Sequence, residues 1–380
     1  IAIAKKKGFA PQIRKALIRS MTETRVNFML LPVNIVKPCE EPRCIYEWGD
    51  GEGWNPAGAP DSFLMPDASR ENKRLNLRCH NNTNTFGYWF SQKDAIPVAP
   101  GTIYKSTFSL ASNIEDQTKV PCIRVRFNRQ NEQMADIIVI NSRGDAAMSP
   151  GPAGKTYTFF FTAPQTEIAL PKDENDIYVS FDVVNFDNTD AAEAEVSLNW
   201  INIDAVPEDR VPEGEKVVSY DFSEGNAGWH TETAPIFTAA EFQSKTCLGM
   251  KALNNKDTYS AWVSPVDMIP IQADTVYAIN WTLFSDQTDK SIVPGIRLRA
   301  GEDSQRFIIA KFIFSNTEGD ESPDCMGAEF KQFYYAAPEL VGANLYIGFD
   351  MLNFNEADSP DAMVGLKSVR VMAIPMNEMP

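Results

Sequence analysis

The sequence lacks most of the motifs on which enzymes and membrane proteins depend. Only two histidines, His80 and His230, occur among 380 residues. No stretch has the form of a GxSxG nucleophile elbow, an HExxH zinc motif or a phosphate-binding Walker loop. No apolar run approaches the roughly 18–20 residues of a membrane span, and the longest candidate, FMLLPV from Phe28, is broken by Pro32. Paired carboxylates could hydrolyse a glycoside, but among 51 acidic residues their presence alone decides nothing. We predict a protein that is not an enzyme and has no membrane span.

Cysteines are few and widely spaced, and no CxxC spacing suggests a zinc site. The six cysteines fall in twos along the chain, at positions 39 and 44, 79 and 122, and 247 and 325. This arrangement favours local disulfide bonds and an oxidising, extracellular compartment, although the connectivity is open. Buried free thiols in a cytoplasmic protein are the alternative. The chain starts at Ile1 without an initiator Met, so we expect that a secretion signal could already have been removed. The disulfide candidates are Cys39, Cys44, Cys79, Cys122, Cys247 and Cys325.

Basic residues are scarce outside the N-terminal segment. Residues 1–38 hold eight Lys and Arg against the single acid Glu23, a net charge of +7, so the rest of the chain carries −16 − 7 = −23. An acidic body argues against nucleic-acid binding, which needs clustered Lys and Arg. A basic segment on an acidic body suggests docking onto an acidic neighbour. A solvated basic tail is the simpler alternative.

One long segment of the sequence is present twice. FDVVNFDN from Phe181 matches FDMLNFNE from Phe349, an offset of 349 − 181 = 168 residues. GDGEGW, which ends at Trp54, matches SEGNAGW, which ends at Trp229, an offset of 229 − 54 = 175 residues. IRVRF from Ile123 likewise matches IRLRA. Solenoid repeats are only about 20–50 residues long. The repeated unit is therefore a whole domain.

The repeated segments have the pattern of β-strands. IYVSFDVV, TYTFFFTAP and TVYAINWTLF are rich in β-branched and aromatic residues and mostly alternate in polarity, and Pro and Gly separate them. Helical periodicity is nearly absent from both units. We predict an all-β protein with two tandem antiparallel β-sandwiches. Its expected parts are an N-terminal arm at 1–43, a first sandwich at 44–206, an exposed linker at 207–215 and a second sandwich at 216–376.

The order of elements resembles the jelly-roll carbohydrate-binding modules of secreted glycan-degrading enzymes, in the galactose-binding-like β-sandwich class. Each unit opens with an aromatic-Gly-Trp stretch, continues through a Trp strand and IRVR or IRLR, and closes with FDxxNF and a final strand. The resemblance lies in this order and spacing rather than in a diagnostic signature. It implies glycan binding, no catalysis and no cofactor apart from a structural calcium ion, for which no run in this sequence has specific ligand spacing.

Aromatic residues at matched positions of the two units are expected in the cores, because large rings dominate packing. Examples are Trp54 with Trp229, Trp89 with Trp262 and Tyr104 with Tyr277. Aromatics private to one unit are better candidates for contact with a sugar, whose C–H face stacks on a ring while polar groups bind its hydroxyls. Only HNNTNTFGYW from His80 combines aromatic rings with polar groups in a loop-like context, although a polar hairpin would have the same pattern. The glycan-binding candidates are Trp48, His80, Asn82, Tyr88, Trp200 and Trp281.

The FDxxNF motif itself is ambiguous. Asp182 alternates with apolar Phe181 and Val183, so it points away from the face that they occupy. We interpret the motif first as a strand end whose Asp and Asn bind loop amides. The rim of a glycan cleft and a metal site are the alternatives.

The N-terminal arm has no counterpart before the second unit. PQIRKALIRSM from Pro11 predicts a short amphipathic helix with a basic outer face, and an extended apolar segment follows from Arg25. The arm either folds back on its own chain or docks onto a neighbouring subunit. The proposed docking residues are Lys5, Lys6, Lys7, Ile13, Leu17, Phe28, Leu30 and Leu31.

Three functions agree with these features. The first is a secreted, non-catalytic structural subunit that self-assembles through its arm into a filament or surface layer. The second is an extracellular glycan-binding protein. The third is a double jelly-roll viral capsid protein, which the strong similarity between the two units disfavours, because it indicates a recent duplication. The expected partners are other copies of the chain and a polysaccharide.

Overall fold

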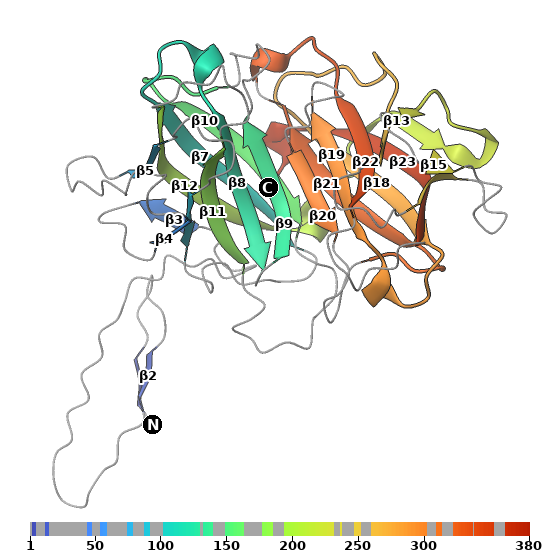
Figure 1. Ribbon diagram of the computed structural model, residues 1–380, viewed down its shortest axis with the longest axis horizontal. Helices are drawn as coiled ribbons and strands as arrows, with labels where there is room; N and C mark the ends of the chain where they lie inside the picture. The colour runs from blue at the N-terminus through green and yellow to red at the C-terminus, as the bar shows by residue number, and fades with distance from the viewer. Residues whose placement is uncertain are drawn as a thin grey trace, which may run out of the picture.

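A computed structural model of the chain shows a protein built almost entirely of antiparallel β-strands (Figure 1). It describes residues 2–4, 12–14, 44–47, 54–58, 74–78, 87–91, 102–129, 132–139, 149–162, 177–184, 194–231, 236–237, 247–251, 260–301, 309–313, 322–336, 338–352 and 362–380. In these residues no helix is long and apolar enough to cross a bilayer. The predicted all-β fold of antiparallel sandwiches is confirmed.

The first sandwich pairs a five-stranded sheet with one half of a ten-stranded sheet. The five-stranded sheet has the order β10-β7-β12-β3, with β5 also paired to β12, and the half-sheet has the order β9-β8-β11-β6-β4. The strands are β3 (Cys44–Glu47), β4 (Trp54–Gly58), β5 (Leu75–Arg78), β6 (Gly87–Ser91), β7 (Thr102–Ser112), β8 (Cys122–Arg129), β9 (Glu132–Val139), β10 (Lys155–Thr162), β11 (Ile177–Val184) and β12 (Glu195–Pro207).

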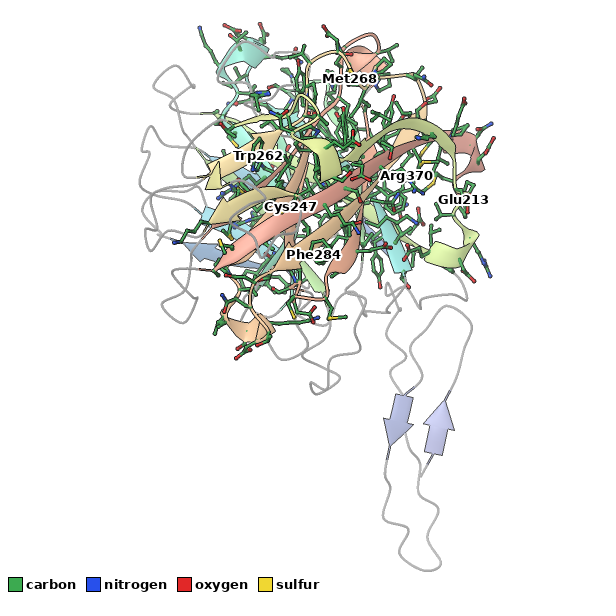
Figure 2. The ribbon with its side chains drawn as sticks, turned by 90° about the vertical axis from the view of Figure 1, so that its right-hand side faces the viewer. Glu213, Cys247, Trp262, Met268, Phe284 and Arg370 are labelled. Carbon is green, nitrogen blue, oxygen red and sulfur yellow. The ribbon has the colours of Figure 1, made fainter. Side chains whose placement is uncertain are left out.

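The second sandwich repeats this plan. A six-stranded sheet, β15-β16-β23-β18-β21 with β13 paired to β23, lies against β14-β17-β22-β19-β20, the other half of the ten-stranded sheet. β18 starts 275 − 102 = 173 residues after β7. Figure 2 labels Cys247, Phe284 and Arg370 across the six-stranded sheet. The strands are β13 (Glu215–Asp221), β14 (His230–Thr231), β15 (Ile236–Phe237), β16 (Leu248–Lys251), β17 (Ser260–Val263), β18 (Thr275–Ser285), β19 (Gly295–Gly301), β20 (Ile309–Ile313), β21 (Ala328–Tyr335), β22 (Tyr346–Leu352) and β23 (Met363–Pro375).

Matched aromatic residues lie in the two cores, as the repeat predicts. All six paired Trp and Tyr residues are buried. The indole Nε1 of Trp89 donates to the carbonyl of Asn76 at 3.1 Å, and Trp262 Nε1 donates to the carbonyl of Gly249 at 3.0 Å. These bonds join equivalent positions of the two units, so each Trp is retained for packing and for one buried hydrogen bond.

An aromatic cluster closes the second core. The ring of Trp229 meets Tyr220, Phe222 and Trp281 edge-on, at centroid distances of 5.5, 5.4 and 6.4 Å. Burial raises the pKa of the Tyr220 phenol to about 12, because the ionised form would lose its hydration. The hydroxyl therefore stays neutral through the physiological range.

The two sandwiches are joined more closely than the exposed linker in the sequence predicts. β20 pairs with β9, which makes the ten-stranded sheet continuous across both units, and the two strands lie side by side in the middle of Figure 1. An apolar cluster also lies between the sandwiches. We call the β9–β20 ladder and this cluster the seam. The cluster consists of Ile103, Phe160, Val206, Val276, Ala278, Phe333, Ile374 and Met379.

The arm contains strands where the sequence predicts a helix. β1 (Ala2–Ala4) pairs with β2 (Gln12–Arg14), and Ile3 lies opposite Ile13. The predicted helix is therefore wrong over residues 12–14, since an isolated short helix is marginal in water and a ladder satisfies the same backbone groups. The other arm residues, Lys5, Lys6, Lys7, Leu17, Phe28, Leu30 and Leu31, lie outside the described residues.

Candidate functional site

A polar row crosses the outer face of the ten-stranded sheet in the first sandwich. On β11, Phe181 and Val183 point into the core, and Asp182 points to the opposite face, as its alternation with them predicts. On β8, Val125 is likewise buried in the core. Arg124, Arg126 and Asn128 share the outer face with Tyr178, Ser180 and Asp182.

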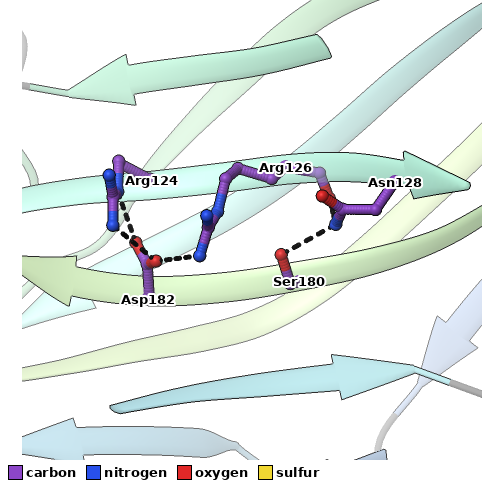
Figure 3. Close-up of polar contacts among 5 residues, drawn as sticks. All are labelled: Arg124, Arg126, Asn128, Ser180 and Asp182. Carbon is purple, nitrogen blue, oxygen red and sulfur yellow. Dashed lines mark hydrogen bonds and ion pairs between the residues drawn. The ribbon is translucent and has the colours of Figure 1, made fainter. Parts of the chain in front are cut away.

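Asp182 is held by two arginines from the neighbouring strand (Figure 3). Arg124 forms a two-pronged bond, with Nε donating to Oδ1 at 2.8 Å and Nη2 donating to Oδ2 at 2.9 Å. Arg126 Nη2 donates to Oδ2 as well. The carboxylate is fully buried, while the Arg124 and Arg126 side chains are 23% and 18% exposed. The aspartate thus fixes two guanidinium groups at the surface, and such ionised, bidentate bonds are among the strongest in proteins.

The second sandwich has the same triad. Arg297 Nε donates to Asp350 Oδ1 at 2.8 Å, and Arg299 Nε lies 3.5 Å from Asp350 Oδ2. Asp350 is fully buried. The repeated FD motif therefore anchors an Arg–Asp–Arg triad inside the sheet. The interpretation of Asp182 as a ligand for loop amides is wrong, because its position in mid-strand faces side chains of β8 instead.

The arginines were missed as site residues, although the sequence contains their signal. R-x-R in IRVRF and IRLRA recurs in both units together with the FD motif. Two basic residues on one strand face and one acid on another fit a cross-strand triad. Nothing in the sequence shows that these two strands are neighbours.

Further features of this face occur only in the first sandwich. Asn128 Nδ2 donates to Ser180 Oγ at 3.0 Å. The half-buried rings of Phe90 and Tyr178 lie edge to face, with centroids 6.4 Å apart and an interplanar angle of 71°. We call these four residues, together with the first triad, the polar–aromatic face.

The second sandwich differs at the equivalent positions. Val263 replaces Phe90, Gly348 replaces Ser180 and Gly301 replaces Asn128. Ala261 and Val263 are buried there with Tyr346 packed against them. The two halves of the sheet therefore share a charged triad but present different surroundings to a ligand.

The structure brings together few of the predicted glycan-binding residues. Tyr88 lies opposite Asp182 in the β6–β11 ladder, at the polar–aromatic face. Trp200 is half-buried on β12, in the other sheet of the sandwich. Trp281 is fully buried, so its prediction as a contact residue is wrong. Trp48, His80 and Asn82 lie outside the described residues, as does FDxxNF beyond Val184.

Disulfide bonding and calcium binding stay predictions. Cys122 and Cys247 are buried and Cys325 is half-buried, and no disulfide is found among these three cysteines, which the structure describes. Cys39 and Cys79 lie outside that part of the chain, and only the strand position of Cys44 is described. The described ranges contain no group of three or more His, Cys, Asp or Glu arranged to hold a metal ion.

Comparisons with known proteins concern the fold. No protein-family model and no curated protein matches the sequence. Among solved structures, the tandem CBM22-1–CBM22-2 domains of Paenibacillus barcinonensis Xyn10C match 89% of this chain and 100% of theirs, at 11% identity and a TM-score of 0.29. The CBM22-1 xylan-binding domain of that protein matches 42% of this chain and 96% of its own, at 12% identity and a TM-score of 0.28. The N-terminal cellulose-binding domain of Cellulomonas fimi β-1,4-glucanase C matches 46% of this chain and 98% of its own, at 13% identity and a TM-score of 0.29. The solved structures found thus include carbohydrate-binding-module sandwiches that cover most of the chain, as the resemblance predicts. At these TM-scores they assign no site or ligand to it.

Proposed function

We propose that this chain is a secreted, non-catalytic glycan-binding protein, and that the glycan lies on the polar–aromatic face of the first sandwich. The observation that carries the proposal is the ring pair of Phe90 and Tyr178 beside the guanidinium groups of Arg124 and Arg126, on one sheet face. A saccharide needs this combination, because its C–H faces are apolar and its edges carry hydroxyls.

The triad supplies the polar half of such a site in advance. Arginine has five N–H donors in a rigid fork, and Asp182 takes only one of those on Arg126. Because the aspartate holds both side chains, little rotamer freedom is lost when a hydroxyl oxygen accepts from them. A preorganised first shell of this kind is expected to raise affinity.

The rings supply the apolar half. Phe90 and Tyr178 are each half-buried, so part of each ring contacts the protein and part remains accessible. Their edge-to-face contact fixes both rings relative to the sheet. The equivalent Val263 of the second sandwich is buried under Tyr346, so we expect one glycan site per chain.

Tyr178→Ala is expected to weaken polysaccharide binding about tenfold or more, the loss of at least one aromatic contact of about 1.4 kcal/mol. Affinity gel electrophoresis against xylan, hydroxyethyl cellulose, β-1,3-glucan, mannan and pectin identifies the ligand, and calorimetric titration then gives the affinity and the number of sites.

Tyr346→Ala is the matched control, because Tyr346 has the equivalent place on β22 of the second sandwich. It should bind like the unaltered chain. Equal losses in both variants would place the glycan elsewhere or show a general loss of structure. Absence of binding to every polysaccharide would end the proposal.

Self-assembly is the second candidate. The β1–β2 ladder belongs to none of the three sheets that build the sandwiches, and the basic arm has the opposite charge to the body. We propose that the arm docks onto the acidic surface of a neighbouring copy, which would give a filament or layer.

Deleting residues 1–37 should then reduce the particle size in light scattering to that of single chains, and raising the salt concentration should act in the same direction, since exposed charges are screened. An unchanged particle size after the deletion contradicts docking by the arm. Electron microscopy of the intact material distinguishes filaments, layers and closed shells.

A further inference from the structure

The β9–β20 ladder of the seam is symmetric with respect to the two units. Asp136 pairs with Arg126 on β8, and Ala310 pairs with Arg299 on β19. Since Arg126 and Arg299 are equivalent in the repeat, Asp136 and Ala310 are equivalent too. These two residues lie opposite each other across the seam. A residue that faces its own equivalent lies on a local two-fold axis.

The neighbouring pairs confirm this axis. Ile137 lies opposite Ile309, and Ala135 lies opposite Lys311. Ile137 is equivalent to Lys311, because they pair with Val125 and Leu298, and Ala135 is equivalent to Ile309. Exchanging the two units therefore converts each pair into the other.

The apolar part of the seam has the same symmetry. Phe160 on β10 and Phe333 on β21 have equivalent positions in the repeat, and their ring centroids are 6.3 Å apart. Both side chains are fully buried. Two further equivalent pairs, Ile103 with Val276 and Val206 with Ile374, belong to the same cluster. Surfaces that meet in this way are self-complementary, as in two-fold dimers.

We infer that the seam is a docking surface for a second copy of this chain, and that two chains associate by exchanging sandwiches. When one seam opens, each sandwich exposes an edge strand and an apolar patch that fit the corresponding parts of another opened chain. The exchanged dimer contains two seams with the contacts of the closed monomer. The closed form dominates while the short linker keeps the two sandwiches at an effective concentration of about millimolar.

The linker contains a residue that controls this choice. Gly214 has a φ of +77°, and a Cβ there would lie 2.6 Å from the carbonyl oxygen of Ala373 and 2.7 Å from Cγ1 of Ile374, a seam residue. The next residue, Glu215, pairs with Ala373 on β23, so a side chain at 214 disfavours the turn by which the linker joins β23 in the closed chain, both through its positive φ and through these contacts. Figure 2 labels Glu213 beside this turn. Before it, Glu208 Oε1 accepts from Lys331 Nζ at 3.0 Å, which ties the linker to the second sandwich.

At a salt concentration that screens docking by the arm, Gly214→Ala is expected to shift the chain from one copy of 42.4 kDa to about twice that mass in size-exclusion chromatography with light scattering, because the closed chain needs the strained turn at 214 and the linker of the exchanged dimer does not. Gly342→Ala is the control. Gly342 also has a positive φ, +91°, but a Cβ there meets nothing within 4 Å. This control should remain a single chain.

The Glu208–Lys331 pair shows whether a seam is formed within one chain or between two chains. A zero-length carbodiimide cross-link between these side chains lies within one chain in the closed monomer and between two chains after exchange. Equal amounts of ¹⁴N- and ¹⁵N-labelled Gly214→Ala chains are unfolded together, refolded and cross-linked. We expect about half of the Glu208–Lys331 cross-links to join a ¹⁴N peptide to a ¹⁵N peptide, as random exchange requires.

The unaltered chain provides a second sample in case Gly214→Ala does not fold. Refolded from denaturant at high protein concentration, it should also give mixed-isotope cross-links, and at low concentration it should not. Same-isotope cross-links alone in every folded sample, or dimers without this cross-link, overturn the inference. The result is independent of glycan binding, because the polar–aromatic face contributes no residue to the seam.

Discussion

Asp182→Ala is expected to lower the free energy of unfolding by about 3–5 kcal/mol, the usual cost of removing one partner from a buried ion pair. The carboxylate is fully buried and accepts three hydrogen bonds from two guanidinium groups. Its loss leaves two positive charges close together with no neutralising group between them. Chemical denaturation followed by tryptophan fluorescence gives the change.

Asp350→Ala should cost a similar amount, because Asp350 is equally buried and has the same two-arginine environment. Asp116→Ala is the control for removing an acid that caps a turn. Asp116 is exposed and accepts from the backbone N–H of Thr118, so its loss should lower the free energy of unfolding much less than the loss of Asp182. If Asp182→Ala lowers the free energy of unfolding no more than this control does, the two arginines are adequately solvated without the carboxylate.

The sequence was sufficient to predict the duplicated sandwich plan, because repeated aromatic positions and strand alternation are local properties. Trp89 and Trp262 are an example: their match in the repeat predicts burial, and each is buried with a hydrogen bond to the neighbouring sheet. Alternation also placed Asp182 on the face opposite Phe181. It could not identify the residues across the sheet, since Arg124 and Arg126 are more than 50 positions away.

The rule that aromatics present in only one unit mark the site failed where different rings fill the two cores. Trp281 has the place that Phe108 has in the first unit, and both are fully buried. Phe108 stacks on Tyr157 at 5.5 Å, whereas Trp281 meets Trp229 at 6.4 Å, so each core is filled by a different set of rings. An aromatic residue present in one unit only can therefore reflect core packing alone.

The seam was not predictable from local patterns. Strand periodicity shows which side chains share a face, but not which edge strand pairs with another. β9 and β20 are both edge strands of their own sandwiches, and their pairing covers two edges that would otherwise be open to other chains. The charged composition of the linker indicates an exposed joint, yet Glu208 binds Lys331 of the second sandwich.

Phe160→Ala is expected to reduce stability by about 3–5 kcal/mol, as is usual for truncating a buried phenylalanine. Phe333→Ala should act similarly, and the double variant should lose less than the sum of the two, since the rings are in contact. The consequence extends to both sandwiches, because the cluster contains side chains of each. We expect one unfolding transition for the whole chain, at a lower denaturant concentration.

Phe159→Ala provides the matched comparison, because Phe159 is the preceding residue on β10, is also fully buried, and stacks on Phe127 in the core of the first sandwich. Hydrogen exchange then separates the two effects. Phe160→Ala should accelerate exchange of the β9 and β20 amides, which form the shared ladder, in both sandwiches together. Phe159→Ala should accelerate exchange of the amides in the first sandwich more than exchange of the β20 amides. If Phe160→Ala leaves the exchange of the β9 and β20 amides unchanged, the ladder holds the sandwiches together without the apolar cluster. A separate transition for each sandwich in the unaltered chain would show that the seam is too weak to couple them.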